Sequence, residues 1–197
     1  MDLTMDKILP NRKLTNWTKS AISLNNYQKY LNRKPDKFQL TIVDLLYISN
    51  FKGGNATINV EEELLNVKLK SYSCILIQID NTFKKQTLAQ ISNSDFEKLI
   101  DYIKNILRLC QTEETTIDGF KSSFLSALLH SYFPNLIPIL DRRLLKNLNL
   151  IQSTDLHKSK QVKKIETFYP NLISKIRDLC KSSNQTIRQI DKEYFIK

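Results

Sequence analysis

The stretch of the chain that decides the fold is residues 119–148, GFKSSFLSALLHSYFPNLIPILDRRLLKNL. Apolar residues recur at helical spacing over residues 122–133, which predicts an amphipathic helix. Pro138 restricts the backbone three residues before Asp141, and aspartate is among the preferred residues at a helix N-cap. We therefore expect a second, short helix that begins at Asp141 or at the next residue and ends at Leu148.

The segments on either side repeat the helical pattern. Ser94 and Glu97 form a predicted capping box at the start of a strongly amphipathic helix that ends at Cys110. Asp36 is the expected N-cap of an earlier helix, and Pro170 is expected to break the C-terminal helices. Further helices are predicted over residues 15–30, 60–79 and 186–195, and the β-branched run 74–77 leaves a short strand open as an alternative.

The composition favours helices over sheets. Only three glycines and five prolines occur in 197 residues, too few for the many tight turns of an all-β fold. The apolar share of 41% in a chain of this length is enough to build a buried core. We predict an all-α fold, a compact multi-helix unit of about eight helices that forms a single domain over residues 1–197. Two helical lobes with the site between them are the alternative.

The net charge of +10 is unevenly distributed along the chain. Residues 1–35 carry a net charge of +5 and residues 142–197 carry +8, whereas residues 36–141 carry −3. Two basic ends around a slightly acidic middle indicate a polyanionic partner, and DNA is the partner that we expect. The alternative is that the excess of lysine reflects codon bias alone. The sequence does not predict the oligomeric state.

The three cysteines predict free thiols. Cys74, Cys110 and Cys180 are widely spaced and odd in number, which fits neither a disulfide framework nor a zinc site. An iron–sulfur cluster normally needs four cysteine ligands, so none is expected, and we predict no metal and no other cofactor. An apolar signal core and a membrane-length apolar segment are both lacking, so a cytoplasmic protein with no membrane partner is expected.

Two features of the 119–148 stretch suggest chemistry. Gly119 allows close backbone approach, and Lys121, Ser122 and Ser123 follow at the first turn of a helix, whose unpaired N–H groups attract phosphate. Asp141 lies between an apolar pair and the two arginines Arg142 and Arg143, an arrangement suited to stabilising a cationic sugar beside a phosphate backbone. A capped glycine turn and an ordinary N-cap aspartate are the structural alternatives.

In the order of these features, the stretch resembles the helix-hairpin-helix DNA glycosylases of the HhH-GPD superfamily, which includes the 8-oxoguanine glycosylases. Gly119, the helix over 122–133, the Pro138–Asp141 approach and a spacing of 22 residues from glycine to aspartate match that family. The resemblance implies a degenerate helix-hairpin-helix module. It also implies DNA base excision on a flipped-out base, with Asp141 stabilising the oxocarbenium ion or activating water.

This chain also departs from the family pattern. Lys121 replaces the second hairpin glycine, and the catalytic lysine of the lyase-competent members falls near Ser123, which is not a lysine. The resemblance therefore implies a monofunctional glycosylase without strand cleavage through a Schiff base. The competing hypotheses are a non-catalytic nucleic-acid-binding or defence-associated module of the same fold, and a helical protein-interaction domain.

Three further residues are candidates. Within the glycine-containing loop 50–55, Phe51 is a candidate for stacking on a base and Lys52 for contacting phosphate. His130 either orients a substrate or is a buried histidine with a hydrogen-bond partner. The sequence thus predicts Asp141 as the catalytic residue and the following as nucleic-acid-binding residues: Gly119, Lys121, Ser122, Ser123, Arg142, Arg143, Phe51 and Lys52.

Overall fold

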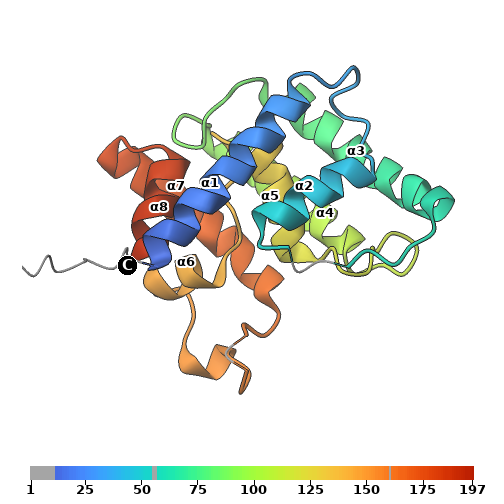
Figure 1. Ribbon diagram of the computed structural model, residues 1–197. Helices are drawn as coiled ribbons and strands as arrows, with labels where there is room; N and C mark the ends of the chain where they lie inside the picture. The colour runs from blue at the N-terminus through green and yellow to red at the C-terminus, as the bar shows by residue number, and fades with distance from the viewer. Residues whose placement is uncertain (1–11, 55–56, 160) are drawn as a thin grey trace, which may run out of the picture.

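The chain folds into an all-α protein, as predicted. The computed structural model describes residues 12–54, 57–159 and 161–197, and within these ranges it contains no β-strand. The helices, drawn in Figure 1, are α1 (Arg12–Leu31), α2 (Ile42–Phe51), α3 (Glu62–Phe83), α4 (Asn93–Leu109), α5 (Ser122–Tyr132), α6 (Arg142–Asn147), α7 (Tyr169–Ser183) and α8 (Ile187–Ile196), with two 3₁₀ turns, η1 (Ser153–Asp155) and η2 (Ile165–Phe168).

Helix α5 lies at the centre of the fold. Its side chains are buried almost all the way round, because it packs against α1, α2 and η2. Leu125, Leu128 and Leu129 are each 0% exposed. The buried polar side chains Ser126, His130 and Ser131 each make a hydrogen bond to a backbone carbonyl oxygen. Figure 1 shows α5 behind α1 and α2, with α3 and α4 to one side and α6, α7 and α8 to the other.

The peripheral helices pair off around this centre. Helices α3 and α4 pack along each other, whereas α8 contacts α1, α6 and α7. Within the described residues, α1 of the first basic end therefore lies beside α8 of the second. One cluster of buried apolar side chains includes members of all eight helices.

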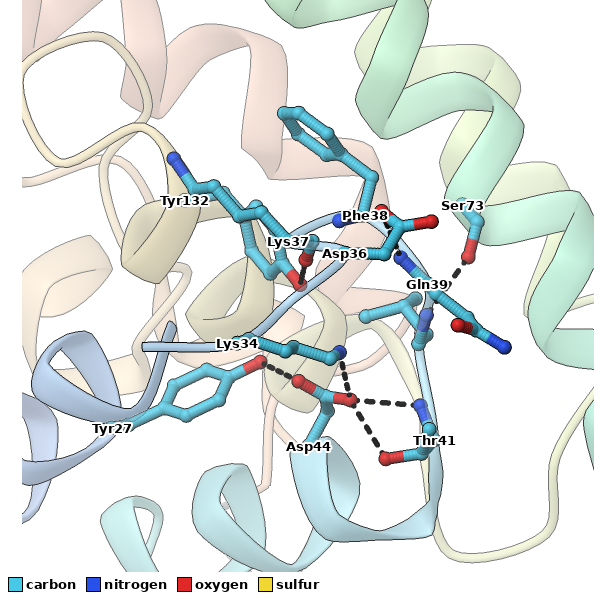
Figure 2. Close-up of polar contacts among 11 residues, drawn as sticks. Tyr27, Lys34, Asp36, Lys37, Phe38, Gln39, Thr41, Asp44, Ser73 and Tyr132 are labelled. Carbon is cyan, nitrogen blue, oxygen red and sulfur yellow. Dashed lines mark hydrogen bonds and ion pairs between the residues drawn. The ribbon is translucent and has the colours of Figure 1, made fainter. Parts of the chain in front are cut away.

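The start of α2 differs from the prediction. Asp36 caps only a turn, where its carboxylate accepts the backbone N–H groups of Phe38 and Gln39. The helix begins later, with Thr41 as N-cap and Asp44 completing a capping box. Figure 2 shows the reason: Asp44 is also bound by Tyr27 and Lys34, which lie on or after the preceding helix. These tertiary hydrogen bonds hold Asp44 in place, so the helix begins at Thr41 and not at Asp36.

Two other local predictions are corrected, and one alternative is excluded. Ser92, rather than Ser94, is the N-cap of α4, and its hydroxyl accepts the N–H of Asp95 at 3.1 Å. Residues 74–77 continue α3 without a strand, as the predicted helix over 60–79 requires, because buried apolar residues recur at helical spacing through Leu76 and Ile79 to Phe83. Pro170 lies in the first turn of α7, where its missing N–H removes no helical hydrogen bond, so it begins a helix instead of breaking one.

The connection between α4 and α5 spans residues 110–121. Thr115 and Thr116 tie it down by donating to the carbonyl oxygens of Leu109 and Cys110. Lys68 of α3 crosses beneath it and donates to the carbonyl oxygens of Glu113 and Thr116. Helix α4 packs on α3 and helix α5 packs on α1 and α2, so the two helices that flank the predicted hairpin have different main neighbours.

None of the helices in the described ranges is both long enough and apolar enough to span a membrane.

Candidate active site at the N-terminus of α6

Asp141 lies at the N-cap of α6, as the sequence predicts. Its carboxylate accepts the backbone N–H of Arg143 at 2.7 Å, and its backbone is extended before the helix begins. About a quarter of the side chain, 26%, remains exposed. Asp141 therefore has a structural role, but part of its carboxylate is still open to a ligand.

Buried hydroxyl groups hold the segment that delivers Asp141. Ser126 of α5 accepts the backbone N–H of Leu140 at 2.9 Å, and Ser123 donates to the carbonyl oxygen of the same residue at 3.2 Å. Tyr169, fully buried at the start of α7, donates to the carbonyl oxygen of Pro138 at 2.6 Å. Backbone groups of Pro138 and Leu140 thus form hydrogen bonds with side chains instead of with a helix or sheet. These bonds fix the position of Asp141.

The structure brings Lys52 and Asp141 together across 89 positions of the sequence. The Lys52 Nζ lies 3.6 Å from Asp141 Oδ2, and its side chain is 13% exposed. Lys52 follows the last residue of α2, and its backbone N–H closes that helix on the carbonyl oxygen of Ile48. Two residues that the sequence predicts for one site therefore do meet. The contact is an ion pair, where the sequence predicts Lys52 as a phosphate ligand.

A second aspartate, Asp191 of α8, lies behind Asp141. It is only 3% exposed and accepts a hydrogen bond from Arg188 one helical turn earlier. Burial raises the pKa of Asp191 to about 6, and the negative charge of Asp141 adds to that rise, while the cations Arg188 and Lys52 oppose it. Asp141, Lys52, Asp191 and Arg188 are the charge cluster of this site.

Arg188 is held in the cluster by aromatic side chains. Its guanidinium carbon lies 3.7 Å from the ring centroid of Trp17 and 6.0 Å from that of Phe51. Burial lowers the pKa of this guanidinium, and Asp191 counteracts the effect. A guanidinium over an aromatic face is attracted to the ring, which offsets part of the cost of burying Arg188.

The prediction for Phe51 is wrong. Its side chain is only 5% exposed, because α1 packs over the end of α2 and Ser20 donates to the Phe51 carbonyl oxygen. A ring in this position cannot stack on a base. Phe51 instead forms part of the wall of the charge cluster beneath Arg188.

The two arginines after Asp141 differ in their environments. Arg142 is exposed. Arg143 is half-buried, with its guanidinium carbon 4.5 Å from the ring centroid of Phe195, and its Nη1 has no hydrogen-bond partner among the described residues. An unpaired buried N–H costs free energy unless a ligand or water supplies an acceptor.

The residues predicted to bind phosphate have mostly structural partners. Gly119 has a φ of +81° and lies so close to Thr57 that an added Cβ would be 2.1 Å from the Thr57 carbonyl oxygen. Ser122 is 6% exposed, and the hydroxyl of Ser123 is used by Leu140. The phosphate role predicted for these two serines is therefore corrected to a structural one. Lys121, at the N-cap of α5, is exposed.

Sequence reasoning missed Asp191 and Arg188. A signal was present, because Ile187, Ile190 and Asp191 lie on one face of α8, the face that is buried against its neighbours. A carboxylate on an apolar stripe is a candidate for a perturbed pKa.

The predicted free thiols are Cys74, which is exposed, Cys110, which is half-buried, and Cys180, which is buried. Within the described ranges no three histidine, cysteine, aspartate or glutamate side chains gather as metal ligands.

Comparison of the chain with protein-family models, with curated proteins and with solved structures gives no match.

Proposed function

We propose that this protein binds DNA and that Asp141 acts in the hydrolysis of an N-glycosidic bond to an extruded base. The observation that supports this most is the placement of Asp141, a partly exposed carboxylate that is fixed at the N-cap of α6 and followed by two arginines. A carboxylate held in place can stabilise the oxocarbenium-like transition state of glycoside hydrolysis.

The surroundings of Asp141 favour a polyanionic substrate. Helices α1, α6 and α7 each contact α8, which holds Asp191 and Arg188, and together the four helices carry 12 basic and 3 acidic residues. Their exposed basic residues include Arg12, Lys13, Lys19, Arg142, Lys146, Lys175, Lys181 and Lys192. Exposed cations attract the phosphates of the DNA backbone, and the affinity of the protein for DNA then depends steeply on salt.

Asp141 has the position that the chemistry requires. Its carboxylate is fixed by the Arg143 N–H, and its remaining oxygen is partly exposed beside Lys52. In the proposed reaction Asp141 stabilises positive charge that develops on the sugar as the base departs, or orients the attacking water. Lys52 then transfers its contact from Asp141 to a substrate phosphate, which frees the carboxylate for this role.

Asp191 is a positioning residue in this proposal. It is too buried to touch a substrate, but it is electrostatically coupled to Asp141 and anchors Arg188. Its protonation changes the negative charge that Asp141 experiences. The rate of base release is therefore expected to change between about pH 5 and pH 7, around the pKa of Asp191.

The test is base release from duplex oligonucleotides that carry one uracil, hypoxanthine, 7-methylguanine or 8-oxoguanine. Abasic sites are cleaved with alkali and the fragments are separated on a gel. We expect one substrate to be processed by the wild-type protein and the rate to fall by about a hundredfold or more in Asp141→Asn, with unchanged folding. Release that is equal in the two proteins excludes Asp141 as the catalytic residue.

A second candidate function is supported by the same ion pair. Lys52 neutralises Asp141 in the free protein, and a carboxylate that serves as N-cap and ion-pair partner has a sufficient structural role without chemistry. A non-catalytic DNA-binding module would then bind DNA only through the exposed basic residues of α1, α6, α7 and α8. In that case Asp141→Asn leaves DNA affinity unchanged and no tested substrate is processed.

A further inference from the structure

The chain between α6 and α7 contains a short hairpin that projects from the helices. Leu156 and Val162 pair in antiparallel fashion, and the backbone N–H of His157 donates to the carbonyl oxygen of Gln161 at 2.8 Å. Figure 1 shows this segment in orange below α6, away from α3. We name residues 155–159 and 161–164 the lysine hairpin.

An apolar pair anchors the lysine hairpin to the body of the protein. Val162 packs against the buried core, and its partner Leu156 is half-buried. Side chains alternate between the two faces of an extended strand, so His157 and Gln161 lie on the outer face, where both are exposed. Lys163, on the other side of Val162, is exposed in the same way. The pairing therefore holds a row of polar side chains toward solvent.

The exposed cations of the lysine hairpin are Lys158, Lys163 and Lys164. Within the described residues, none of the three forms an ion pair with a carboxylate. The Lys163 ammonium donates instead to the carbonyl oxygen of Thr154 at 3.0 Å. Lysines of α4 differ, because Lys98 lies 3.0 Å from the carboxylate of Asp95. The fold thus leaves the charges of the hairpin without counter-ions.

Two acidic residues flank the three lysines without neutralising them. The carboxylate of Asp155 accepts the backbone N–H of Gln152 at 2.7 Å, so it serves the turn that precedes the hairpin. Glu166 is half-buried in η2. Like charges on one surface element repel one another and create a positive field, and a polyanionic partner relieves that repulsion.

Helix α6 links the lysine hairpin to Asp141. Its exposed residues Arg142 and Lys146 are four positions apart, so they lie on one face of the helix. A helix rises about 1.5 Å per residue, so the six residues of α6 span only about 9 Å. Basic side chains therefore follow one another from the proposed catalytic carboxylate to the hairpin.

We propose that the lysine hairpin binds the backbone phosphates of DNA, and that the bound strand runs from Asp141 along Arg142 and Lys146 to the hairpin lysines. This inference rests on the proposed function and adds to it a phosphate-binding element outside the helices. A lysine ammonium contacts phosphate as a point charge, without the fixed geometry that reading a base requires. The hairpin thus positions the strand and does not select its sequence.

An anionic membrane is the competing polyanion, and the lysine hairpin does not fit it. Segments that lie on membranes combine basic residues with apolar side chains that enter the bilayer. The exposed residues in the described part of the hairpin are all polar or charged, and its apolar pair is partly buried. The observations therefore favour DNA.

The test is the affinity for a duplex oligonucleotide, measured by fluorescence anisotropy between about 50 and 200 mM salt. Each phosphate contact contributes about 0.9 to the slope of log K against log salt concentration. We expect the triple variant Lys158→Gln, Lys163→Gln, Lys164→Gln to lower this slope by about 2 to 3 and to weaken binding at least about tenfold near physiological salt. Glutamine keeps an N–H donor for Thr154, and circular dichroism verifies that the variant folds.

The matched control is the triple variant Lys70→Gln, Lys84→Gln, Lys85→Gln. These lysines are exposed on α3 or directly after it, away from the hairpin, and their loss changes the net charge by the same amount. We expect the slope of the control to change by less than about 1. A third protein with arginine in place of the hairpin lysines keeps the charge and is expected to keep the wild-type slope.

Three results overturn the inference. If the wild type binds DNA and the hairpin and control variants change the slope equally, the hairpin is excluded and the proposed function stands. If the hairpin variant keeps its slope on DNA but loses binding to vesicles that contain phosphatidylserine, the hairpin is a membrane contact. If the wild type itself does not bind DNA, the proposed function fails, and this inference fails with it.

Discussion

Two buried aspartates, Asp44 and Asp191, show opposite ways of placing a carboxylate inside this protein. Both are nearly inaccessible, at 0% and 3% exposed, and both are paired with a basic side chain. Asp44 accepts hydrogen bonds from Tyr27, Lys34 and both the backbone N–H and the hydroxyl of Thr41 (Figure 2). Its oxygens are satisfied within the fold.

Asp191 is in a less complete network. Its partner Arg188 keeps an unpartnered Nη2, the nearby Asp141 adds negative charge, and its pKa is raised to about 6. A buried polar network with every bond made specifies the fold, whereas one with unmade bonds carries a free-energy cost that a ligand can relieve. This difference is why we locate function at Asp141 and assign Asp44 to stability.

The largest effect is expected for Asp44→Ala. It leaves the Lys34 ammonium, whose side chain is only 7% exposed, without its carboxylate and removes the capping box of α2. Removing one partner of a buried ion pair typically costs about 3–5 kcal/mol. Urea unfolding measures the loss. The matched control is Asp36→Ala, where an exposed turn loses two acceptor bonds at a cost of about 1 kcal/mol. Equal losses in the two variants would remove the distinction between the networks.

A second prediction concerns His130 and acid. Its pKa falls from 6.5 to about 4 on folding, so the stabilisation from the neutral ring is complete above pH 6.5 and is lost as the pH falls through 4. The contribution at neutral pH is about 3 kcal/mol. The unfolding free energy is measured for wild type and His130→Asn at a series of pH values. As the pH rises from 4 to 6.5, the wild type should gain stability relative to the variant. A difference that stays constant from pH 4 to pH 7 would contradict the depressed pKa.

Asp191 is expected to have the opposite pH dependence. Its pKa rises from 3.8 to about 6 on folding, so the folded protein loses stability as the pH rises from about 4 to about 6 and the buried carboxyl ionises. The magnitude is again about 3 kcal/mol. In the wild type this loss opposes the gain from His130 over the same pH range. In Asp191→Asn only the rise from His130 remains. Equal slopes in the wild type and in Asp191→Asn between pH 4 and pH 6 would show that the pKa of Asp191 is not perturbed.

The smallest effect is expected for Lys52→Met. The ion pair with Asp141 is 3.6 Å long and partly exposed, so its loss should cost about 1 kcal/mol or less. Because Lys52 lowers the pKa of Asp191, that pKa should rise in the variant. Carboxyl ¹³C shifts during a pH titration measure it. A pKa of Asp191 that is unchanged in Lys52→Met would mean that the two groups are not coupled.

The sequence predicted local features better than tertiary ones. The helix over 122–133 and the N-cap role of Asp141 follow from periodicity and cap preference, which act within one turn of helix. Asp36 has the residue type of an N-cap, but α2 begins at Thr41 because Tyr27 and Lys34 bind Asp44, and these contacts depend on the tertiary fold. Asp191 was missed because its perturbation depends on Asp141 and Lys52, which reach it only through the fold.

Burial also explains which predicted site residues changed role. Phe51 and Ser122 lie in segments with local signs of binding loops, a glycine turn and a helix N-terminus. Neither signal reveals that α1 covers the end of α2 or that Gly119 lies against Thr57. Long-range packing of this kind is not encoded in any single window of sequence.

The most direct test of the central claim is the affinity of the purified protein for labelled duplex and single-stranded DNA across a salt series. Wild type and Asp141→Asn are measured side by side. We predict binding that weakens steeply with salt, because exposed basic residues of α1, α6, α7 and α8 contact the phosphates. This binding is expected to persist in the variant. No binding to either form of DNA at about 150 mM salt would contradict the proposed function and its non-catalytic alternative together.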